Sequence, residues 1–361
     1  METKLLDLNL DKSCFIVVGS KNIIKNVKSE LESSPLLLCG KEMKEKVYDK
    51  YLGDFIHGLG NSESAHQTIK ERYWRVVYCI LEARSIIEDC RSSVVGGLGA
   101  GIDLWELAYL PSLLNNCETW VDISEDSVKL LDDLQNQMYR TLLCVPKLTP
   151  MPALCWDMGG ILMKYRIMQK KLVFLSHLKN LDKSTLARQV LDVQVQHRMD
   201  GLVQECLTFC AELKIPNIVC EEIPHAKWKI IVGKAIKLKN EETLVAKMMN
   251  SKKLQKSDMV TETFKRRDYI SNMLLSDSRT MFQYRSSMTE HVKMNYSSDP
   301  KYKAELWKCD SCQVSIDTQD HVLWCPSYSE LRQGRNLTCD TDLTRYLHDV
   351  LVIRQKLNLN K

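Results

Sequence analysis

Short apolar runs separated by turn-forming residues occupy the first sixty positions of the chain. Runs bounded by Gly, Ser, Pro or Asn predict strands of a small sheet at residues 14–18, 36–39 and 50–56. Between the first two runs, apolar residues from Ile23 to Leu31 recur at helical spacing. We therefore expect a strand, a helix and then two or three further strands in this region.

Beyond Gly60 the apolar positions recur every three or four residues, which is the spacing of amphipathic helices. It predicts helices over residues 62–90, 102–116, 124–145, 161–180, 183–200, 201–213 and 340–358, with residues 225–295 helical and basic. Ser62 or Ser64 is the expected N-cap of the first helix. The three prolines within residues 146–156 predict an extended connector, and Gly96–Gly101 predicts a flexible turn.

These elements predict an α+β fold that is mainly helical, with a small N-terminal sheet and a cysteine-bearing C-terminal segment. With 361 residues, 44% hydrophobic and 27% charged, the composition suits ordinary globular cores. No apolar run reaches the about 18 residues of a membrane span, and the N-terminus lacks signal-peptide features. Fourteen scattered cysteines favour a reducing compartment, so we expect an intracellular protein, nuclear or cytoplasmic.

The formal net charge of +4 is unevenly distributed along the chain. Residues 227–268 contain twelve Lys and Arg against five Asp and Glu, a local net charge of +7. This basic band predicts salt-sensitive binding of nucleic acid, and a solvated helical face is the alternative interpretation. The candidate contacts in the band are Lys252, Lys253, Lys265, Arg266 and Arg267. The last three lie between Phe264 and Tyr269, a pattern that suits phosphate contact combined with base stacking.

Near the C-terminus, three cysteines and a histidine have the spacing Cys309-x2-Cys312-x8-His321-x3-Cys325. Thiolate and imidazole ligands favour Zn²⁺, and four protein ligands leave no position for a reacting water, so we predict a structural zinc site. The alternative is two unrelated cysteine pairs in a core. Trp307 and Trp324 flank the ligands and are candidates for base stacking.

Several longer stretches resemble one protein family. They are "KYLGDFIHGLGNSESAHQTIKERY", "LWELAYLPSLLNNCETW", "LLDDLQNQMYRTLLCVPKLTPMPALCWDMGGILMKYRIMQKKL" and, at the cysteine-rich end, "TQDHVLWCPSYSELRQGRNL". Together they resemble the region from the end of the palm through the thumb to the C-terminal zinc knuckle of non-LTR (LINE-type) retrotransposon reverse transcriptases. The resemblance implies four segments: a palm-like end (1–60), a helical thumb (61–150), a basic helical connector (151–300) and a zinc knuckle with a last helix (301–361).

Polymerases of that family hold two Mg²⁺ ions on palm carboxylates that include an Ala-Asp-Asp turn. That sequence does not occur here, and the only Asp pair, Asp132–Asp133, lies in a helical pattern and is expected to be a surface feature. The resemblance assigns Lys12 to the palm-motif lysine, and Tyr51, Leu52 and Gly53 to the primer-grip hairpin. We therefore expect no Mg²⁺ site and no polymerase activity from this chain alone.

The resulting hypothesis is a catalytically incomplete remnant of an RNA-directed DNA polymerase. It binds RNA or an RNA–DNA duplex through its thumb helices, the basic band and a zinc knuckle. A second hypothesis is a helical protein-interaction module in which zinc is only a structural staple. A third is a fragment of an active reverse transcriptase, which an in-frame Ala-Asp-Asp upstream of Met1 would reveal. The sequence leaves open which nucleic acid is bound and the oligomeric state.

Overall fold

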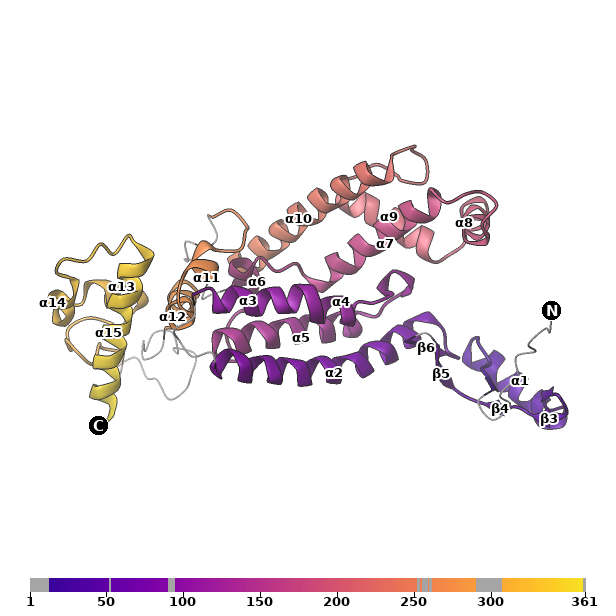
Figure 1. Ribbon diagram of the computed structural model, residues 1–361, viewed down its shortest axis with the longest axis horizontal. Helices are drawn as coiled ribbons and strands as arrows, with labels where there is room; N and C mark the ends of the chain where they lie inside the picture. Colours follow the sequence, from indigo (N-terminus) through magenta and orange to yellow (C-terminus); the bar gives the residue numbers. More distant parts are fainter. Residues whose placement is uncertain are drawn as a thin grey trace, which may run out of the picture. The chain divides into compact units, whose positions relative to one another are not determined.

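The computed structural model describes residues 13–51, 53–89, 95–251, 254, 259, 262–289 and 307–359. It confirms the predicted fold class, a mainly helical α+β chain with small sheets near the N-terminus (Figure 1). The chain divides into two compact units. Unit 1 comprises Met1–Arg75, Leu113–Leu131 and Arg166–Ala235, and unit 2 comprises Val76–Ser112, Asp132–Tyr165 and Ile236–Lys361. The four consecutive segments implied by the resemblance stay a prediction.

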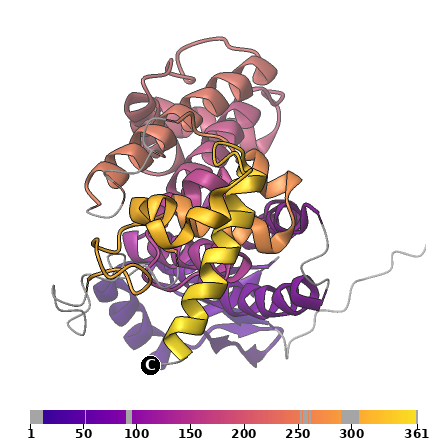
Figure 2. The ribbon, with the colours of Figure 1, turned by 90° about the vertical axis from the view of Figure 1, so that its left-hand side faces the viewer.

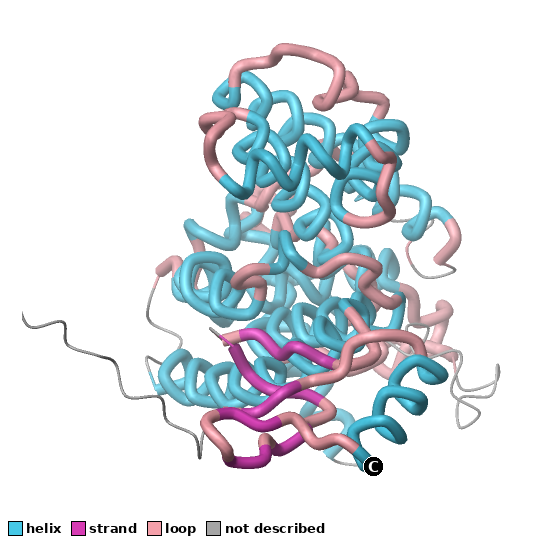
Figure 3. Tube along the Cα trace, turned by 90° about the vertical axis from the view of Figure 1, so that its right-hand side faces the viewer, coloured by secondary structure: helices cyan, strands magenta, loops and turns pink. Residues whose placement is uncertain are grey.

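The strands of unit 1 form three two-stranded sheets where the sequence predicted one small sheet (Figure 3). β1 (Cys14–Phe15) pairs in parallel with β4 (Lys44–Glu45), whereas β2 (Leu37–Leu38) with β3 (Lys41–Glu42) and β5 (Tyr48–Tyr51) with β6 (Asp54–His57) are antiparallel. The single strand predicted at 50–56 is wrong, because the chain reverses at Gly53, whose φ of +93° favours glycine. α1 (Lys21–Ser33) forms as predicted.

The β5–β6 hairpin is attached to the start of the long helix α2 (Asn61–Asp89) by hydroxyl groups. The amides of Phe55 and His57 donate to Thr68 Oγ1 and Ser64 Oγ, both at 2.9 Å. α2 begins at Asn61, so Ser62 and Ser64 both lie inside its first turn, and neither is the N-cap that the sequence suggested. These two hydrogen bonds hold the β5–β6 hairpin on α2, although no third strand pairs with it in the described residues.

Arg72 of α2 fixes the tip of the same hairpin. Its guanidinium donates to Gly53 O at 3.0 Å, to Asp54 Oδ1 at 2.8 Å and to Asn115 O at 2.6 Å. Asn116 Nδ2 donates to the other carboxylate oxygen of Asp54 at 2.7 Å. A buried guanidinium is stable only with such partners, and here they join the hairpin to residues 115–116.

The remaining helical elements of the described residues follow the predicted order, with their bounds as follows. They are α3 (Gly97–Leu104), a π-helical turn (Trp105–Tyr109), α4 (Leu110–Leu113), a 3-10 turn (Cys117–Thr119), α5 (Glu125–Leu143), α6 (Met151–Met158), α7 (Met163–Lys179), α8 (Leu186–Gln196), α9 (Leu202–Leu213), α10 (His225–Met249), α11 (Asp268–Asn272), α12 (Leu275–Arg285), α13 (Gln319–Trp324), a 3-10 turn (Pro326–Tyr328), α14 (Ser329–Arg332) and α15 (Asp340–Leu359).

Three local predictions in the helical part are wrong. Gly97–Gly101 begin helix α3 instead of forming a flexible turn, and only Gly96, with φ +77°, has the left-handed conformation. Met151–Met158 form a helix whose last six residues are buried, so residues 146–156 are not an extended connector. The region 225–295 is interrupted, because α10 ends at Met249 and the next described helix begins at Asp268.

Of the Asp pair expected at the helix surface, Asp133 is exposed, whereas Asp132 is half-buried and contacts another helix. Its Oδ1 accepts a hydrogen bond from the amide of Met163 at 3.0 Å, at the first residue of α7. Burial raises the pKa of Asp132, and the bond from Met163 opposes that rise. A carboxylate at a helix N-terminus satisfies one of the otherwise unpaired amides, so Asp132 caps α7.

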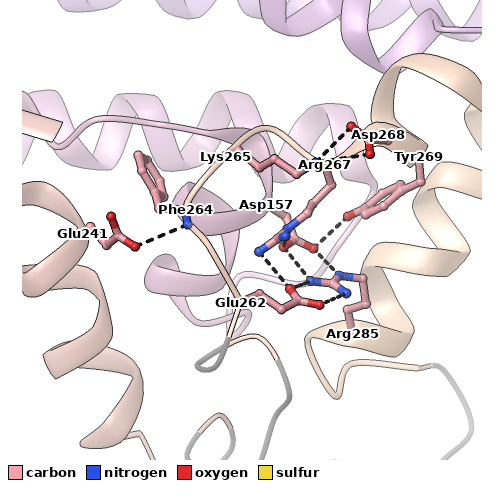
Figure 4. A network of polar contacts seen from close by, with 9 residues as sticks. All are labelled: Asp157, Glu241, Glu262, Phe264, Lys265, Arg267, Asp268, Tyr269 and Arg285. Carbon is pink, nitrogen blue, oxygen red and sulfur yellow. Dashed lines mark hydrogen bonds and ion pairs between the residues drawn. The ribbon is translucent and has the colours of Figure 1, made fainter. Parts of the chain in front are cut away.

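A buried ionic network ties the segment around residues 262–285 to α6 (Figure 4). Asp157 is 0% exposed, and its oxygens accept from Arg285 Nε at 2.8 Å and Nη2 at 3.2 Å. Tyr269 Oη donates to the same carboxylate at 2.9 Å, and Arg267 Nε lies 3.4 Å from it. Glu262 pairs with both arginines. Every charge of the network therefore faces an opposite charge, as burial requires.

Two glycines offer a paired test of packing in the helical body. A Cβ at Gly160 would lie 2.6 Å from the hydroxyl oxygen of buried Tyr139, whereas one at Gly233 of α10 would have its nearest neighbour at 3.9 Å. Gly160→Ala should lower the free energy of unfolding by about 1–3 kcal/mol because the ring must shift. Gly233→Ala should raise it by about 0.5–1 kcal/mol, because glycine is unfavourable inside a helix. Urea denaturation of both variants checks the two signs, and equal effects would contradict this packing.

Candidate metal centre

The first two cysteines of the predicted site lie on a tight turn. Lys308 and Ile316 form an antiparallel bridge, and the amide of Cys309 donates to Ser315 O at 2.9 Å. The chain reverses between them through Gln313, whose φ is +58° and whose amide donates to Cys309 O at 2.8 Å. The turn brings Cys312 back beside Cys309, which is what a Cys-x2-Cys pair needs to bind one ion.

The histidine and the last cysteine are placed by the short helix α13. Thr318 is its N-cap, and Thr318 Oγ1 accepts from the amide of His321 at 3.0 Å. His321 therefore lies in the first turn, and Cys325 is the C-cap residue one turn later. Residues four apart lie on the same face of a helix, so both side chains point toward the cysteine turn.

The structure brings these four residues together as the spacing predicted. Their ligand atoms all lie within 4.8 Å of one another. Cys309 Sγ and Cys325 Sγ are 3.9 Å apart, and Cys312 Sγ lies 3.4 Å from His321 Nε2. In a tetrahedral zinc site with Zn–S of about 2.3 Å and Zn–N of about 2.0 Å, the corresponding separations are roughly 3.8 and 3.5 Å. The cluster can therefore hold a metal ion.

The surroundings of the cluster differ between its members. Cys309 and Cys325 are fully buried, and burial raises the pKa of the Cys325 thiol to about 11. Burial also opposes ionisation of Cys312, but the amides of Ser315 and Val314 donate to its sulfur and hold the pKa of this thiol below its usual value. Burial lowers the pKa of His321, which favours the neutral, metal-binding imidazole.

Helix α15 covers the cluster and gives it a small core. Cys309 and Cys325 share a buried apolar cluster with Val322, Tyr328, Tyr346, Leu347 and Val350. Figure 2 shows α15 as the yellow helix that ends at the C-terminus. Tyr346 Oη donates to Val322 O at 2.5 Å, and Arg332 donates to Cys325 O at 2.8 Å. The two bonds fix both ends of the segment that carries the last ligand. Residues 307–359 thus form one C-terminal module, not an isolated turn.

The two tryptophans predicted to stack on bases have different positions. The Trp324 side chain is 68% exposed although it directly precedes Cys325. Trp307 is partly buried, and its carbonyl accepts from the amide of Asp317 at 2.6 Å. Trp324 is therefore available to a ligand, and Trp307 closes the base of the cysteine loop.

The predicted basic contacts that the structure describes are engaged within the chain. Lys265 pairs with Asp268 at 3.2 Å, Arg266 pairs with Asp103 at 2.7 Å, and Arg267 belongs to the buried network of Asp157. Lys252 and Lys253 lie outside the described residues. The role of all five residues in binding nucleic acid stays a prediction. Arg267 also has a structural role, which the sequence alone did not indicate.

The residues assigned by the resemblance to the palm are only partly described. Lys12 and Leu52 lie outside the described residues, whereas Tyr51 and Gly53 lie at the turn of the β5–β6 hairpin. The Tyr51 side chain is 65% exposed. A hairpin is thus present where the resemblance placed one, and its role in holding a primer stays a prediction.

The sequence analysis did not single out the lysines of α10, although they lie inside the basic band. This helix buries one residue in every four: Trp228, Val232, Ile236, Asn240, Leu244 and Met248 are all fully buried. Lys227, Lys229, Lys234 and Lys237 are exposed. The period of four in the buried residues could have identified these lysines as solvent-facing.

The chain was compared with protein families, curated proteins and solved structures. No protein-family model, no curated protein and no solved structure matches the chain. Within the described residues, none of the helices combines the length and the apolar character needed to cross a membrane.

Proposed function

We propose that this chain binds RNA or an RNA–DNA duplex and that zinc in the Cys309–Cys312–His321–Cys325 cluster has a structural role. The exposed lysines of α10 and, separately, Trp324 of the C-terminal module are the groups that we expect to contact nucleic acid. In this proposal the chain carries no nucleotidyl-transfer chemistry of its own and represents a catalytically incomplete part of a LINE-type reverse transcriptase. The sequence resemblance is the support for that origin.

The donor set favours zinc over the other common divalent ions. Three thiols and one imidazole are soft to borderline ligands, which suit Zn²⁺ and do not suit Mg²⁺ or Ca²⁺. Four protein ligands would complete a tetrahedron and leave no open position for a water or a substrate. The ion would therefore stabilise the module and would not take part in a reaction.

The exposure of the lysines of α10 is the observation that carries the nucleic-acid proposal. Phosphate contacts supply most of the affinity of non-specific nucleic-acid binding, and they require cations that reach solvent. Lys227, Lys234 and Lys237 meet that requirement, whereas the guanidinium of Arg267 is already neutralised by carboxylates. Trp324 adds an exposed ring on which a base can stack.

Charge reversal on α10 tests the proposal. Lys227→Glu/Lys234→Glu/Lys237→Glu should weaken binding of single-stranded RNA and of an RNA–DNA duplex by about 10-fold or more at low salt. The slope of log K against log salt should become shallower by about 0.7–0.9 for each phosphate that the variant no longer neutralises. Fluorescence anisotropy with labelled RNA and with labelled duplex measures both quantities.

A matched control keeps the change in net charge the same. Lys21, Lys25 and Lys183 are also exposed but lie outside the basic band, and Lys21→Glu/Lys25→Glu/Lys183→Glu should retain most of the affinity. Equal losses of affinity in the two triple variants would mean that only net charge matters, and the proposed surface would then be incorrect.

A second candidate function, a protein-interaction module, is favoured by one observation in the N-terminal residues 13–57. α1 buries none of its side chains, and apolar side chains of the strands and turns are exposed, including Val18, Leu37, Val47 and Tyr51. Exposed apolar surface of this kind is common at protein interfaces. Under this candidate, the triple reversal on α10 would leave partner binding intact.

A further inference from the structure

Arg354 of α15 is the buried cation that lies nearest to the proposed metal ligands in the described part of unit 2. Its side chain is 4% exposed. Nη1 and Nη2 donate to the two carboxylate oxygens of Asp317 at 3.0 and 2.7 Å, and Nε donates to Tyr328 Oη at 3.1 Å. Nη2 also lies 3.7 Å from Cys309 Sγ, within the range of an N–H···S hydrogen bond.

The partners of Arg354 orient its guanidinium toward the sulfur. Asp317 is itself 1% exposed, and a bidentate carboxylate fixes the plane of a guanidinium. The Tyr328 hydroxyl accepts from Nε on one edge, and the Tyr328 ring lies 5.8 Å from the guanidinium carbon. Cys309 is left on the Nη2 edge. Because Asp317 neutralises the charge of Arg354, Arg354 acts on Cys309 mainly by donating a directed N–H hydrogen bond and less by its positive charge.

We propose that Arg354 is a positioning residue of the metal centre, which donates a hydrogen bond to the metal-bound thiolate of Cys309 and thereby couples metal binding to the docking of α15. This inference rests on the metal site proposed above. A thiolate accepts such a bond more strongly than a thiol does, so binding of an ion strengthens the contact between α15 and the cysteine turn. Conversely, docked α15 stabilises the metal-bound state, since coupling between two sites is reciprocal.

Substitutions at the Arg354–Asp317 pair separate this role from simple stability. Arg354→Met alone would remove the arginine that faces the buried Asp317 carboxylate, so the informative variant is Asp317→Asn/Arg354→Met, which removes both charges together. It should bind Zn²⁺ about 10- to 100-fold more weakly than the wild type, as is typical when a group that supports a metal ligand is removed. Arg354→Lys keeps an N–H donor, but an ammonium group lacks the planar geometry that lets a guanidinium donate to Asp317, Tyr328 and Cys309 together. This variant should therefore retain only part of the affinity for Zn²⁺.

The Co²⁺-loaded protein gives a readout that a purely structural role would not change. A hydrogen bond stabilises the sulfur lone pair, so its removal should move the thiolate-to-cobalt charge-transfer band to longer wavelength. The matched control is Arg335→Met, which removes an arginine of the same module that pairs with Asp349 of α15 at 2.6 Å. It should leave both the band and the affinity for Zn²⁺ unchanged.

The outcomes distinguish the two levels of the proposal. A wild-type chain that binds neither Zn²⁺ nor Co²⁺ would overturn the metal site itself. A wild-type chain that binds metal, with a folded double variant of unchanged affinity and unchanged band, would overturn only the role of Arg354. If the double variant does not fold, NMR of the ¹¹³Cd-loaded wild-type protein tests the hydrogen bond instead. A scalar coupling between ¹¹³Cd and a guanidinium proton of Arg354 is expected. If that proton exchanges slowly enough to be observed but shows no coupling to ¹¹³Cd, the hydrogen bond is contradicted.

Discussion

Replacing Cys309 with serine is expected to abolish metal binding by the chain and to unfold the C-terminal module of residues 307–359. The module has one small apolar cluster, in which two of the buried members, Cys309 and Cys325, are also proposed metal ligands. Without the ion, these sulfurs contribute little, whereas structural zinc contributes an apparent about 10–16 kcal/mol to small zinc-binding domains. We therefore expect bound zinc to fall from about one per chain to near zero, and the amides of α13 and α15 to lose protection from hydrogen exchange.

Cys339→Ser is the matched control for this prediction. Cys339 is exposed and lies outside the cluster, so its replacement should leave both zinc content and amide protection unchanged. Elemental analysis of the purified proteins and hydrogen-exchange mass spectrometry provide the two measurements. If Cys309→Ser retained a full equivalent of zinc, or if α15 stayed protected after chelation of the metal, the ion would not be the element that holds the module together.

The substitution Asp157→Asn is expected to give the largest loss of stability in unit 2 outside the metal centre. Asp157 is fully buried and accepts from Arg285, Arg267 and Tyr269 (Figure 4). The amide keeps the shape of the side chain but removes its charge. Of the two carboxylates described beside these partly buried arginines, only Glu262 would then keep its charge. Breaking a buried pair from one side typically costs about 3–5 kcal/mol, because the remaining charge loses its partner.

The neighbouring pair Lys265–Asp268 provides the control within the same segment. Its side chains are 53% and 76% exposed, and solvent screens such a pair, so Asp268→Asn should cost less than about 1 kcal/mol. Hydrogen exchange of α6 and α12 in a urea series reports the unfolding of this part of the chain. Similar losses of stability in Asp157→Asn and Asp268→Asn would contradict the assignment of the network as a buried, fully paired one.

Local periodicity predicted most of the helices correctly. In α5, Val128, Leu131, Leu134, Met138 and Leu142 recur at helical spacing; the last four are buried, and Val128 is half-buried. Ser124 was expected near the start of this helix, and its hydroxyl accepts from the amide of Ser127 at 3.2 Å. Such features depend on residues three or four positions apart, so they can be recognised from the sequence without knowledge of the fold.

The proposed metal ligands were predictable for the same reason. Cys309, Cys312, His321 and Cys325 lie within seventeen positions, and one tight turn and one helix turn bring them together. The spacing could not indicate Arg354, because its contact with Cys309 spans 45 positions and depends on how α15 packs. A buried arginine and an exposed one have the same appearance in a sequence.

The local pattern of residues did not indicate the surroundings of three parts of the chain. Arg267 follows a lysine and an arginine and appeared to be part of a solvent-exposed basic cluster, but Asp157 lies 110 positions away and neutralises it. Asp132 appeared exposed in the helical pattern until its contact with Met163 placed it at the start of α7. Residues 146–156 were assigned as a connector from their prolines, yet Pro150 and Pro152 stand at the start of α6, where proline is tolerated.

The proposed function is tested most directly by titrating the zinc-loaded wild-type chain with labelled single-stranded RNA over a salt series from about 50 to about 200 mM. Binding at low salt, with log K falling linearly with log salt at a slope of about −2 or steeper, is the expected result, because the proposal has at least three exposed lysines of α10 contacting phosphates. No measurable binding at the lowest salt, or an affinity that does not change with salt, would contradict the proposal that this chain binds nucleic acid through its basic surface.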